Sequence, residues 1–346
     1  MYVYFMFILT ILGLTHTSAF TKITQVQSNC RVVALLIIIC FAIFRYDIGF
    51  DYNNYFNFIA RNDDSVIEKF EPISFSLMYI ARMTDYPPMI FVIFGIPMYL
   101  YAYRGFVNSS ANVGFSIIIY IALFYLFSLG AIRQALAMSI CIYNYTNLRK
   151  RKAFSFLVYA IIASMVHYSA LISLLIYPIY HRISFAILLI GSILMFVLKK
   201  TIIFIISKYT VYGAYLEDLT LVSGGQLKQL FYIFLFFSIF FIIKYKSFKE
   251  EEVNLLKLVF LSSLFPLLFG TALGDRISNN LYIYYCFLLP LLLKGKKLYK
   301  RIFYNSLFLS YFLFYVCYTT YGTGNTAPYV PYKTIFTSYG DPFKQY

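Results

Sequence analysis

The run "VVALLIIICFAIF" (Val32–Phe44) is followed without a break by "RYDIGFDYNNYF" (Arg45–Phe56), and this junction decides what kind of fold the chain can adopt. The first run is apolar and forms the core of a segment that can cross a bilayer, whose hydrocarbon region is about 30 Å thick. The second run concentrates an arginine, two aspartates and two asparagines. This alternation predicts membrane helices separated by short polar breaks.

The composition extends this prediction to the whole chain. Of its 346 residues, 61% are hydrophobic and only 12% are charged, and the mean hydropathy is +0.73, well above that of a soluble domain. Apolar segments centred near residues 10, 38, 95, 120, 140, 160, 174, 191, 236, 261, 287 and 310 predict about twelve spans, with a range of about 10 to 12. The expected fold is a single all-α polytopic membrane domain over residues 1–346.

Two smaller features fit this class. The first segment has the small residues "HTSA" but lacks the basic start of a signal peptide, so a retained helix is preferred over a cleaved signal. The five cysteines lie in or beside apolar runs without metal-ligand spacing, which indicates buried thiols rather than disulfides or a zinc site.

Basic residues set the expected orientation, because cytoplasmic loops retain lysine and arginine. The clusters "LRKRK" (148–152), "KYKSFK" (244–249) and "KGKKLYKR" (294–301) fall on one side when the spans alternate. That side then holds 17 of the 29 basic residues but three of the 14 acidic ones. The net charge of +15 is therefore a topology signal, and nucleic-acid binding is a poor explanation for it.

This topology places both termini outside, with an external loop over 45–86 and an external tail over 319–346. Lys199 and Lys200 contradict the rule, because they end the eighth segment on the outer side. Either that span is drawn wrongly or the two lysines meet an anion.

The polar residues that interrupt the apolar pattern gather at the expected external ends of the spans. They are Arg45, Asp47 and Asp51 after the second span, Arg133 and Gln134 at the start of the fifth, His167 between the sixth and seventh, and Asp275 and Arg276 in the loop between the tenth and eleventh. Four hairpins thus bring ionisable groups to one membrane level.

Arginine carries a forked set of donors that matches phosphate oxygens, so three arginines at one level predict a polyanion site. For each arginine the alternative is interfacial snorkelling. Arg133 is the strongest candidate, because a charge within "SLGAIRQALAMS" is expensive without a partner. Its structural alternative is a pair with Asp51 or Asp275.

His167 and the opening motif supply the other candidate groups. His167 could be a general base, a phosphate contact or a hydrogen-bonded structural residue. Gly49 permits a turn, after which Asp51, Tyr52 and Tyr55 would share one helical face suited to sugar hydroxyls. The alternative is a hydrated loop in which Asp51 caps a helix.

Residues 68–83, "EKFEPISFSLMYIARM", predict an amphipathic helix with Pro72 in its first turn. Phe70, Ile73, Leu77 and Ile80 recur at helical spacing. We expect this helix to lie in the outer interface, as a rim for a lipid-borne substrate.

These motifs together resemble the EpsG family of polysaccharide polymerases, which is close to the Wzy O-antigen polymerases. The similar elements are "RYDIGFDYNNYF", "FEPISFSLMYIA", "GAIRQALAMSICIYNYTNLRKRK" with "SMVHYSALISLLIYPI", "GDRISNNLYIYY" and "APYVPYKTIF". Residues 185–260 match only as hydrophobic spans.

The resemblance implies a multi-pass glycosyltransferase of the bacterial inner membrane that needs no cofactor or metal. It would polymerise undecaprenyl-diphosphate-linked oligosaccharide units at the external (periplasmic) face of the membrane. The product would be O-antigen, as part of lipopolysaccharide biosynthesis, or a related surface polysaccharide. Its partners would be the lipid-linked oligosaccharide, membrane lipids and a chain-length regulator protein.

The residues take expected roles under this resemblance. The catalytic set is Asp51, Arg133, His167 and Arg276, and the substrate-binding set is Arg45, Asp47, Tyr52, Tyr55, Glu71, Gln134, Asp275 and Tyr332. No histidine accompanies "GDRISNN", which puts any scheme with a second imidazole in doubt. The acidic "RNDD" at 61–64 is a weak metal candidate.

Other classes stay open. A flippase for the same lipid-linked units would carry charges deep in its spans and often internal repeats, and neither is evident. An O-antigen ligase would share the arginine–diphosphate logic and differ in its acceptor. An acyltransferase is weaker, because His167 has no acidic partner nearby in the sequence.

Overall fold

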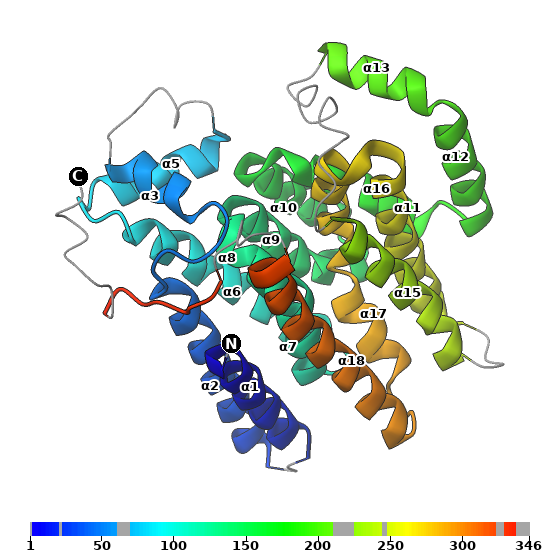
Figure 1. Ribbon diagram of the computed structural model, residues 1–346. Helices are drawn as coiled ribbons and strands as arrows, with labels where there is room; N and C mark the ends of the chain where they lie inside the picture. The colour runs from blue at the N-terminus through cyan, green and yellow to red at the C-terminus, as the bar shows by residue number, and fades with distance from the viewer. Residues whose placement is uncertain are drawn as a thin grey trace.

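The computed structural model describes residues 2–20, 23–60, 70–209, 225–243, 248–322 and 329–336 (Figure 1). The regular secondary structure in these ranges is helical, and the one β-type contact among the described residues is the isolated bridge between Arg45 and Thr334. The expected all-α class is confirmed.

The helices follow one another with short connections, many of them of two to five residues. In chain order they are α1 (Tyr2–Phe20), α2 (Thr24–Ile43), α3 (Tyr52–Ala60), α5 (Pro72–Arg82), α6 (Met89–Ser109), α7 (Val113–Tyr120), a π-helical turn (Ile121–Tyr125), α8 (Leu126–Gly130), α9 (Ile132–Arg149), α10 (Ala153–Val166), a 3-10 turn (Tyr168–Ile172), α11 (Ser173–His181), α12 (Phe185–Val197), α13 (Lys199–Tyr209), α15 (Gly225–Ile243), α16 (Glu250–Tyr282), α17 (Tyr285–Leu292), α18 (Leu298–Cys317) and a π-helical turn (Tyr318–Gly322).

Each of the twelve segments expected from the sequence contains a helix, but twelve full spans are not confirmed. Among the described residues, five helices are long and apolar enough to cross a bilayer, or six if the bent pair α12–α13 is one span. Several of the other helices, such as α10 with 14 residues and α11 with 9, are shorter than the roughly 17 residues that a crossing needs. A polytopic membrane protein is compatible with this pattern.

The bent pair explains the two lysines that contradict the charge rule. α12 and α13 meet at an angle of 72°, and Lys199 and Lys200 begin α13 instead of ending a straight span. Nζ of Lys199 donates to the carbonyl of Leu267 at 3.1 Å. This geometry favours the alternative that the eighth span was drawn wrongly.

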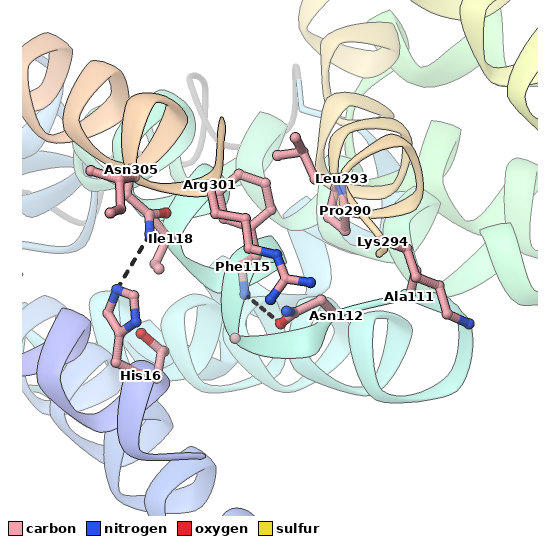
Figure 2. A pocket seen from close by; sticks show the side chains of 13 residues that line it. His16, Ala111, Asn112, Phe115, Ile118, Pro290, Leu293, Lys294, Arg301 and Asn305 are labelled. Atoms are coloured by element: carbon pink, nitrogen blue, oxygen red, sulfur yellow. Dashed lines mark hydrogen bonds between the residues drawn. The ribbon is translucent and has the colours of Figure 1, made fainter. Parts of the chain in front are cut away.

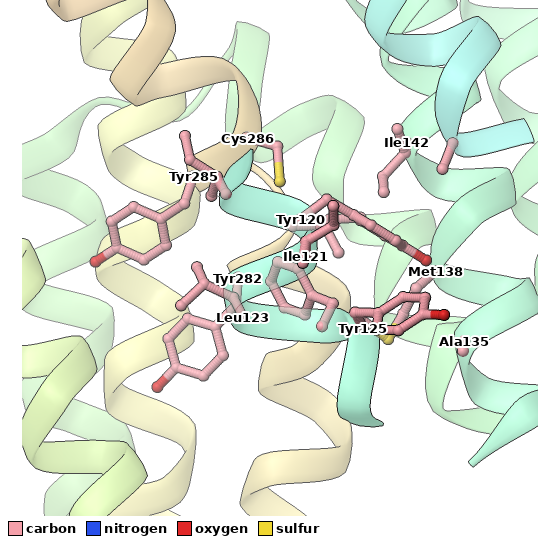
Figure 3. Close-up of a cluster of buried hydrophobic side chains, with 14 of the residues drawn as sticks. Tyr120, Ile121, Leu123, Tyr125, Ala135, Met138, Ile142, Tyr282, Tyr285 and Cys286 are labelled. Atoms are coloured by element: carbon pink, nitrogen blue, oxygen red, sulfur yellow. The ribbon is translucent and has the colours of Figure 1, made fainter. Parts of the chain in front are cut away.

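The core forms where α6, α7, α9 and α17 pack against one another. Gly105 of α6 lies so close to α9 that an added Cβ would come within 2.7 Å of the Ile142 carbonyl oxygen. Figure 3 shows Tyr120, Met138, Tyr285 and Cys286 of these helices and their connections meeting in one buried cluster. Close helix contact of this kind stabilises membrane bundles by van der Waals packing.

The polar motif after α2 is packed against the end of α8, directly before α9. Gly49 has φ +103°, a conformation that favours glycine, and an added Cβ would come within 2.5 Å of the Leu129 carbonyl oxygen. The expected turn at Gly49 is therefore confirmed. It brings Asp51 to the level of Arg133.

α16 turns back on itself at Gly270, whose φ is 74° and ψ 179°. An added Cβ on Gly274 would approach the backbone of Pro266 within 2.5 Å, so the two limbs lie in contact. Asp275 and Arg276 belong to the returning helical limb. The expectation that they fill an interhelical loop was wrong, because the reversal occurs earlier, at Gly270.

The bundle has two chemically different ends. At one end Arg149 lies 3.4 Å from Glu251 and Arg151 lies 3.1 Å from Glu250, while Nη1 of Arg149 donates to the carbonyl of Ser109. We call this the cationic end. Arg133 stands sixteen positions before Arg149 on the same helix, about 24 Å away at 1.5 Å per residue. We call the Arg133 level the site end.

The expected amphipathic helix is present as α5, but its polarity is inverted relative to a soluble helix. The buried face carries Ser74, Met78 and Ala81, whereas Tyr79 and Ile80 are about half exposed. Ser74 Oγ donates to the carbonyl of Val166 at 2.6 Å, which fixes α5 to the end of α10. An outward apolar face is what a helix in contact with lipid requires.

Candidate functional site

Glu71, immediately before α5, joins α9 to the α10–α11 connection. Its Oε2 lies 2.5 Å from Nη1 of Arg133, and its Oε1 accepts from the backbone N–H of Tyr168 at 3.0 Å. The Glu71 side chain is 5% exposed and that of Arg133 is 18% exposed. The acid that pairs with Arg133 is thus Glu71, and not Asp51 or Asp275 as the sequence suggested.

Aromatic rings complete the surroundings of Arg133. Its Cζ lies 4.0 Å from the centre of the Phe70 ring, a cation–π contact, and Nε lies 3.5 Å from the hydroxyl of Tyr55. Burial raises the pKa of Tyr55, so this phenol stays protonated and accepts through its oxygen. Arg133 is held from two sides.

His167 ends α10 in an extended conformation, and its ring is fixed by Ser169. The backbone N–H of Ser169 donates to Nδ1 at 3.2 Å, and Ser169 Oγ lies 2.8 Å from the same nitrogen. Because an amide N–H can only donate, Nδ1 is the acceptor and the ring proton sits on Nε2. Nε2 makes no hydrogen bond to any residue that the structure describes.

The charge state of His167 follows from its surroundings. Burial lowers the pKa of His167 from its ordinary value near 6.5 to about 3, and the positive charges of Arg133 and Arg276 act in the same direction. His167 is therefore a neutral imidazole with an available Nε2–H, which suits a hydrogen-bond donor better than a base.

Asn280 and Gln134 connect His167 to Arg276. Asn280 Nδ2 donates to Ser169 Oγ and to the carbonyl of Arg276, both at 3.1 Å, and Gln134 Nε2 donates to the same carbonyl at 2.7 Å. This network fixes the returning limb of α16 against α9. Residues Ser169 and Asn280 were missed from the sequence, although Asn280 stands four positions after Arg276 in "GDRISNN" and so shares its helical face.

Asp51 faces the same group of charges. Burial raises the pKa of its carboxyl, while a hydrogen bond from Asn54 and the charges of Arg276 and Arg133 oppose the increase. A partly buried carboxylate with a raised pKa is suited to accept a proton near neutral pH. Arg133 and Arg276 thus act electrostatically on both Asp51 and His167 at the site end, and we call these four residues the site cluster.

Three other predicted site residues, two buried and one half-buried, make their contacts away from this cluster. Arg45 is 2% exposed and donates to the carbonyls of Ile48 (3.2 Å), Leu129 (2.8 Å) and Ala42. Tyr52 stacks on Phe91 at 4.4 Å, and the Tyr332 hydroxyl donates to the carbonyl of Phe41 at 2.6 Å. Arg45 therefore stabilises the loop after α2, and the contacts of Tyr52 and Tyr332 are likewise with other parts of the fold.

Two carboxylates also point elsewhere. Asp47 forms a 3.1 Å ion pair with Lys333, within the segment 329–336 whose backbone bonds to the loop after α2 through Tyr46 and Ile335. Asp275 acts electrostatically on Tyr282 and Tyr311.

The "RNDD" metal candidate at 61–64 lies outside the described residues. Among the described residues, no group of three or more His, Cys, Asp and Glu side chains is arranged to hold a metal ion.

The site cluster can therefore bind an anion and accept a proton. Two guanidinium groups supply positive charge, His167 supplies a neutral N–H donor, and Asp51 supplies a carboxylate. Such fixed donors stabilise negative charge that develops during a reaction.

Comparison with known proteins agrees with the motifs. No curated protein and no solved structure matches the chain. The family model described as "EpsG family" matches residues 28–334, a range that includes every member of the site cluster, and the chain belongs to the EpsG family.

Proposed function

We propose that this protein polymerises undecaprenyl-diphosphate-linked oligosaccharide repeat units into O-antigen or a related surface polysaccharide. The EpsG family comprises Wzy-like polymerases, which supports a membrane polysaccharide polymerase. The observation that carries the proposal is the convergence of Asp51, Arg133, His167 and Arg276 at one end of the bundle.

The proposed reaction transfers the growing chain from its carrier to the next carrier-bound unit. The bond between the anomeric carbon and the diphosphate oxygen breaks, and the acceptor hydroxyl oxygen forms the new bond to that carbon. The hydroxyl proton passes to Asp51, whose raised pKa suits it as a base. The bonding electrons of the broken bond remain on the diphosphate.

The leaving diphosphate gains negative charge as it departs, and this charge is what the cations would stabilise. Arg133 and Arg276 supply the positive charge, and the Nε2–H of His167 donates to a phosphate oxygen. Glu71 holds Arg133 in place in the absence of substrate. Tyr55 contacts Arg133 and Gln134 donates to the carbonyl of Arg276, so both are candidates for contacts with sugar or carrier.

The face at which the reaction occurs follows from the charge rule. The cationic end carries the basic clusters at 148–152 and 294–301 and would face the cytoplasm, so the site end would face the periplasm of a bacterial inner membrane. α5, with its exposed apolar face, would form a rim in the outer leaflet over which a lipid-linked unit enters. A chain-length regulator protein is the partner that this role requires.

The test is a deletion of the gene in its host, complemented with the wild type or with Arg133→Ala, His167→Ala, Asp51→Asn or Arg276→Ala at matched membrane levels. Surface polysaccharide is then resolved on a gel. A single repeat unit on the lipid core in the deletion strain, with a ladder restored by the wild type, is the expected result for a polymerase.

Two other outcomes identify the rival functions. Long polymer that stays on its carrier in the deletion strain would identify a ligase. Loss of all external repeat units would identify a flippase. An intact ladder in all four variants would exclude the site cluster as the reaction centre.

A further inference from the structure

A hollow at the cationic end lies apart from the site cluster, between α1, α7, α17 and α18 (Figure 2). Its volume is about 150 Å³, and its floor consists of apolar side chains, among them Phe115, Ile118 and Leu293. A second hollow of about 250 Å³ shares Asn112 and Arg301 with it and adds Arg31. The α6–α7 turn that lines both belongs to the cationic end, because Arg149 donates to Ser109 there.

Positive charge surrounds the polar side of this hollow. Figure 2 shows the guanidinium of Arg301 beside Asn112, at the beginning of α7, and Lys294 reaching out from the end of α17. The Asn112 Oδ1 accepts from the backbone N–H of Phe115 at 3.1 Å, so its Nδ2 remains as a donor on this side. Two cations and an amide donor on this side of the hollow form a set of hydrogen-bond donors that suits a phosphate group.

Asn305 supplies the complementary group. Its Nδ2 lies 3.3 Å from Nε2 of His16, whereas its buried Oδ1 has no hydrogen-bond partner among the described residues. A buried acceptor of this kind is costly unless a ligand donor meets it. A ligand with both a phosphate and a hydroxyl group would satisfy both parts of the hollow.

The surroundings indicate that this ligand comes from the membrane. Ile302 lines the hollow and is 53% exposed, and its neighbours Tyr299 and Phe303 are 56% and 43% exposed. Apolar side chains exposed on a membrane helix face lipid. An acyl chain could therefore lie along α18 while the headgroup enters between Lys294 and Arg301.

We propose that this hollow binds the headgroup of an anionic phospholipid that carries free hydroxyl groups, as phosphatidylglycerol does. Basic pockets between membrane helices on the cytoplasmic side bind such headgroups. The proposal is independent of the reaction proposed at the site end.

The test uses the full chain in detergent and native mass spectrometry, with phosphatidylglycerol, phosphatidylethanolamine and free glycerol phosphate as separate probes. We expect phosphatidylglycerol to be retained, and retention to fall about tenfold in the double variant Lys294→Gln/Arg301→Gln. The matched control, Lys150→Gln/Lys152→Gln, removes two exposed basic residues at the same end and should retain the lipid.

A second variant tests the hydroxyl contact without changing the charge. Asn305→Leu removes the buried acceptor, so it should weaken phosphatidylglycerol more than phosphatidic acid, whose headgroup has no glycerol. Three results would each overturn the proposal. The first is equal lipid loss in the Lys294→Gln/Arg301→Gln variant and in the Lys150→Gln/Lys152→Gln control. The second is retention of phosphatidylethanolamine equal to that of phosphatidylglycerol, and the third is tight binding of free glycerol phosphate. The first two results indicate non-specific lipid and the third a soluble ligand.

Discussion

Nη1 of Arg133 lies 2.5 Å from Oε2 of Glu71, so an arginine at the first turn of α9 is neutralised by a residue that precedes α5. The pair is largely buried, and the carboxylate also holds the backbone N–H of Tyr168. Glu71 therefore does two things at once: it compensates the charge of Arg133 and connects α5 to the α10–α11 connection.

A charge reversal separates the structural part of this pair from its part in the reaction. Arg133→Glu and Glu71→Arg alone should each lower stability by about 3 kcal/mol, because each leaves like charges in a buried place. The double variant should recover part of the thermal stability, because the ion pair is restored but a guanidinium cannot accept from the N–H of Tyr168. It should give no polymer ladder, since the cation is then absent from α9. A restored ladder in the double variant would show that the pair is structural only.

The protonation of His167 gives the second prediction. If Nε2–H is a donor, His167→Gln should keep activity within about tenfold of the wild type, because its amide N–H lies near the same place. His167→Asn and His167→Ala should lose about 100-fold, as expected for loss of a charge-stabilising donor. The rate of ladder formation in membranes measures this. A Gln variant as inactive as the Ala variant would favour a role for His167 as base.

The pKa of His167 also predicts how stability depends on pH. The value is about 3 in the folded state and near 6.5 in the unfolded chain, so between them only the unfolded state binds the proton. The contribution of the neutral His167 to the free energy of unfolding is therefore fully present above pH 6.5. It is lost as the pH falls, by at most about 1.4 kcal/mol per pH unit. Thermal unfolding in detergent between pH 4 and 7 should show a shallower decline for His167→Gln. Identical slopes would argue against a neutral buried imidazole.

Much of the fold could be predicted because hydrophobic runs are local. Each of the expected apolar segments contains a helix, and the turn at Gly49 and the position of His167 between two helices follow from the sequence. The number of spans could not be predicted, because α16 reverses at Gly270 and the chain bends by 72° between α12 and α13. Hydropathy measures length and polarity, and it contains no information on such bends.

The sequence predicted at which end of the membrane bundle the site lies, but not the contacts within it. Alternating spans predicted Asp51, Arg133, His167 and Arg276 at one end, and in the structure the two arginines act electrostatically on both Asp51 and His167. The partner of Arg133 could not be predicted, because the sequence offered Asp51 and Asp275 at that level and tertiary packing of α5 selects Glu71. The burial of Arg45 depends on the approach of Leu129, which is 84 positions away.

Arg45 and Arg276 should therefore fail in different ways when they are replaced. Arg45→Met leaves the carbonyls of Ile48 and Leu129 without a buried donor, so we expect a stability loss of about 3 kcal/mol and a lower membrane level. Arg276→Met should keep its membrane level and lose the ladder. Immunoblots of membranes beside polysaccharide gels distinguish the two. A normal level of Arg45→Met without a ladder would return Arg45 to the reaction site.

The two aspartates of "RYDIGFDYNNYF" provide the sharpest comparison, because they lie in one motif and differ in surroundings. Asp47 pairs with Lys333, and both side chains are about one third to one half exposed, so the pair contributes about 0–1 kcal/mol. Asp51 faces Arg133 and Arg276 and is the proposed base. Asp47→Asn should consequently leave the ladder nearly unchanged, and Asp51→Asn should remove it at an equal membrane level.

A third variant makes this comparison independent of folding. Asp51→Glu keeps a carboxylate but moves it by one methylene, so it should restore part of the ladder, with repeat units added more slowly than in the wild type. Lys333→Gln serves as the control for the other aspartate, because it breaks the Asp47 pair from the opposite side. If Asp51→Asn supports a normal ladder, the proton must pass to another group, and Asp51 would then act only through its charge beside the two arginines.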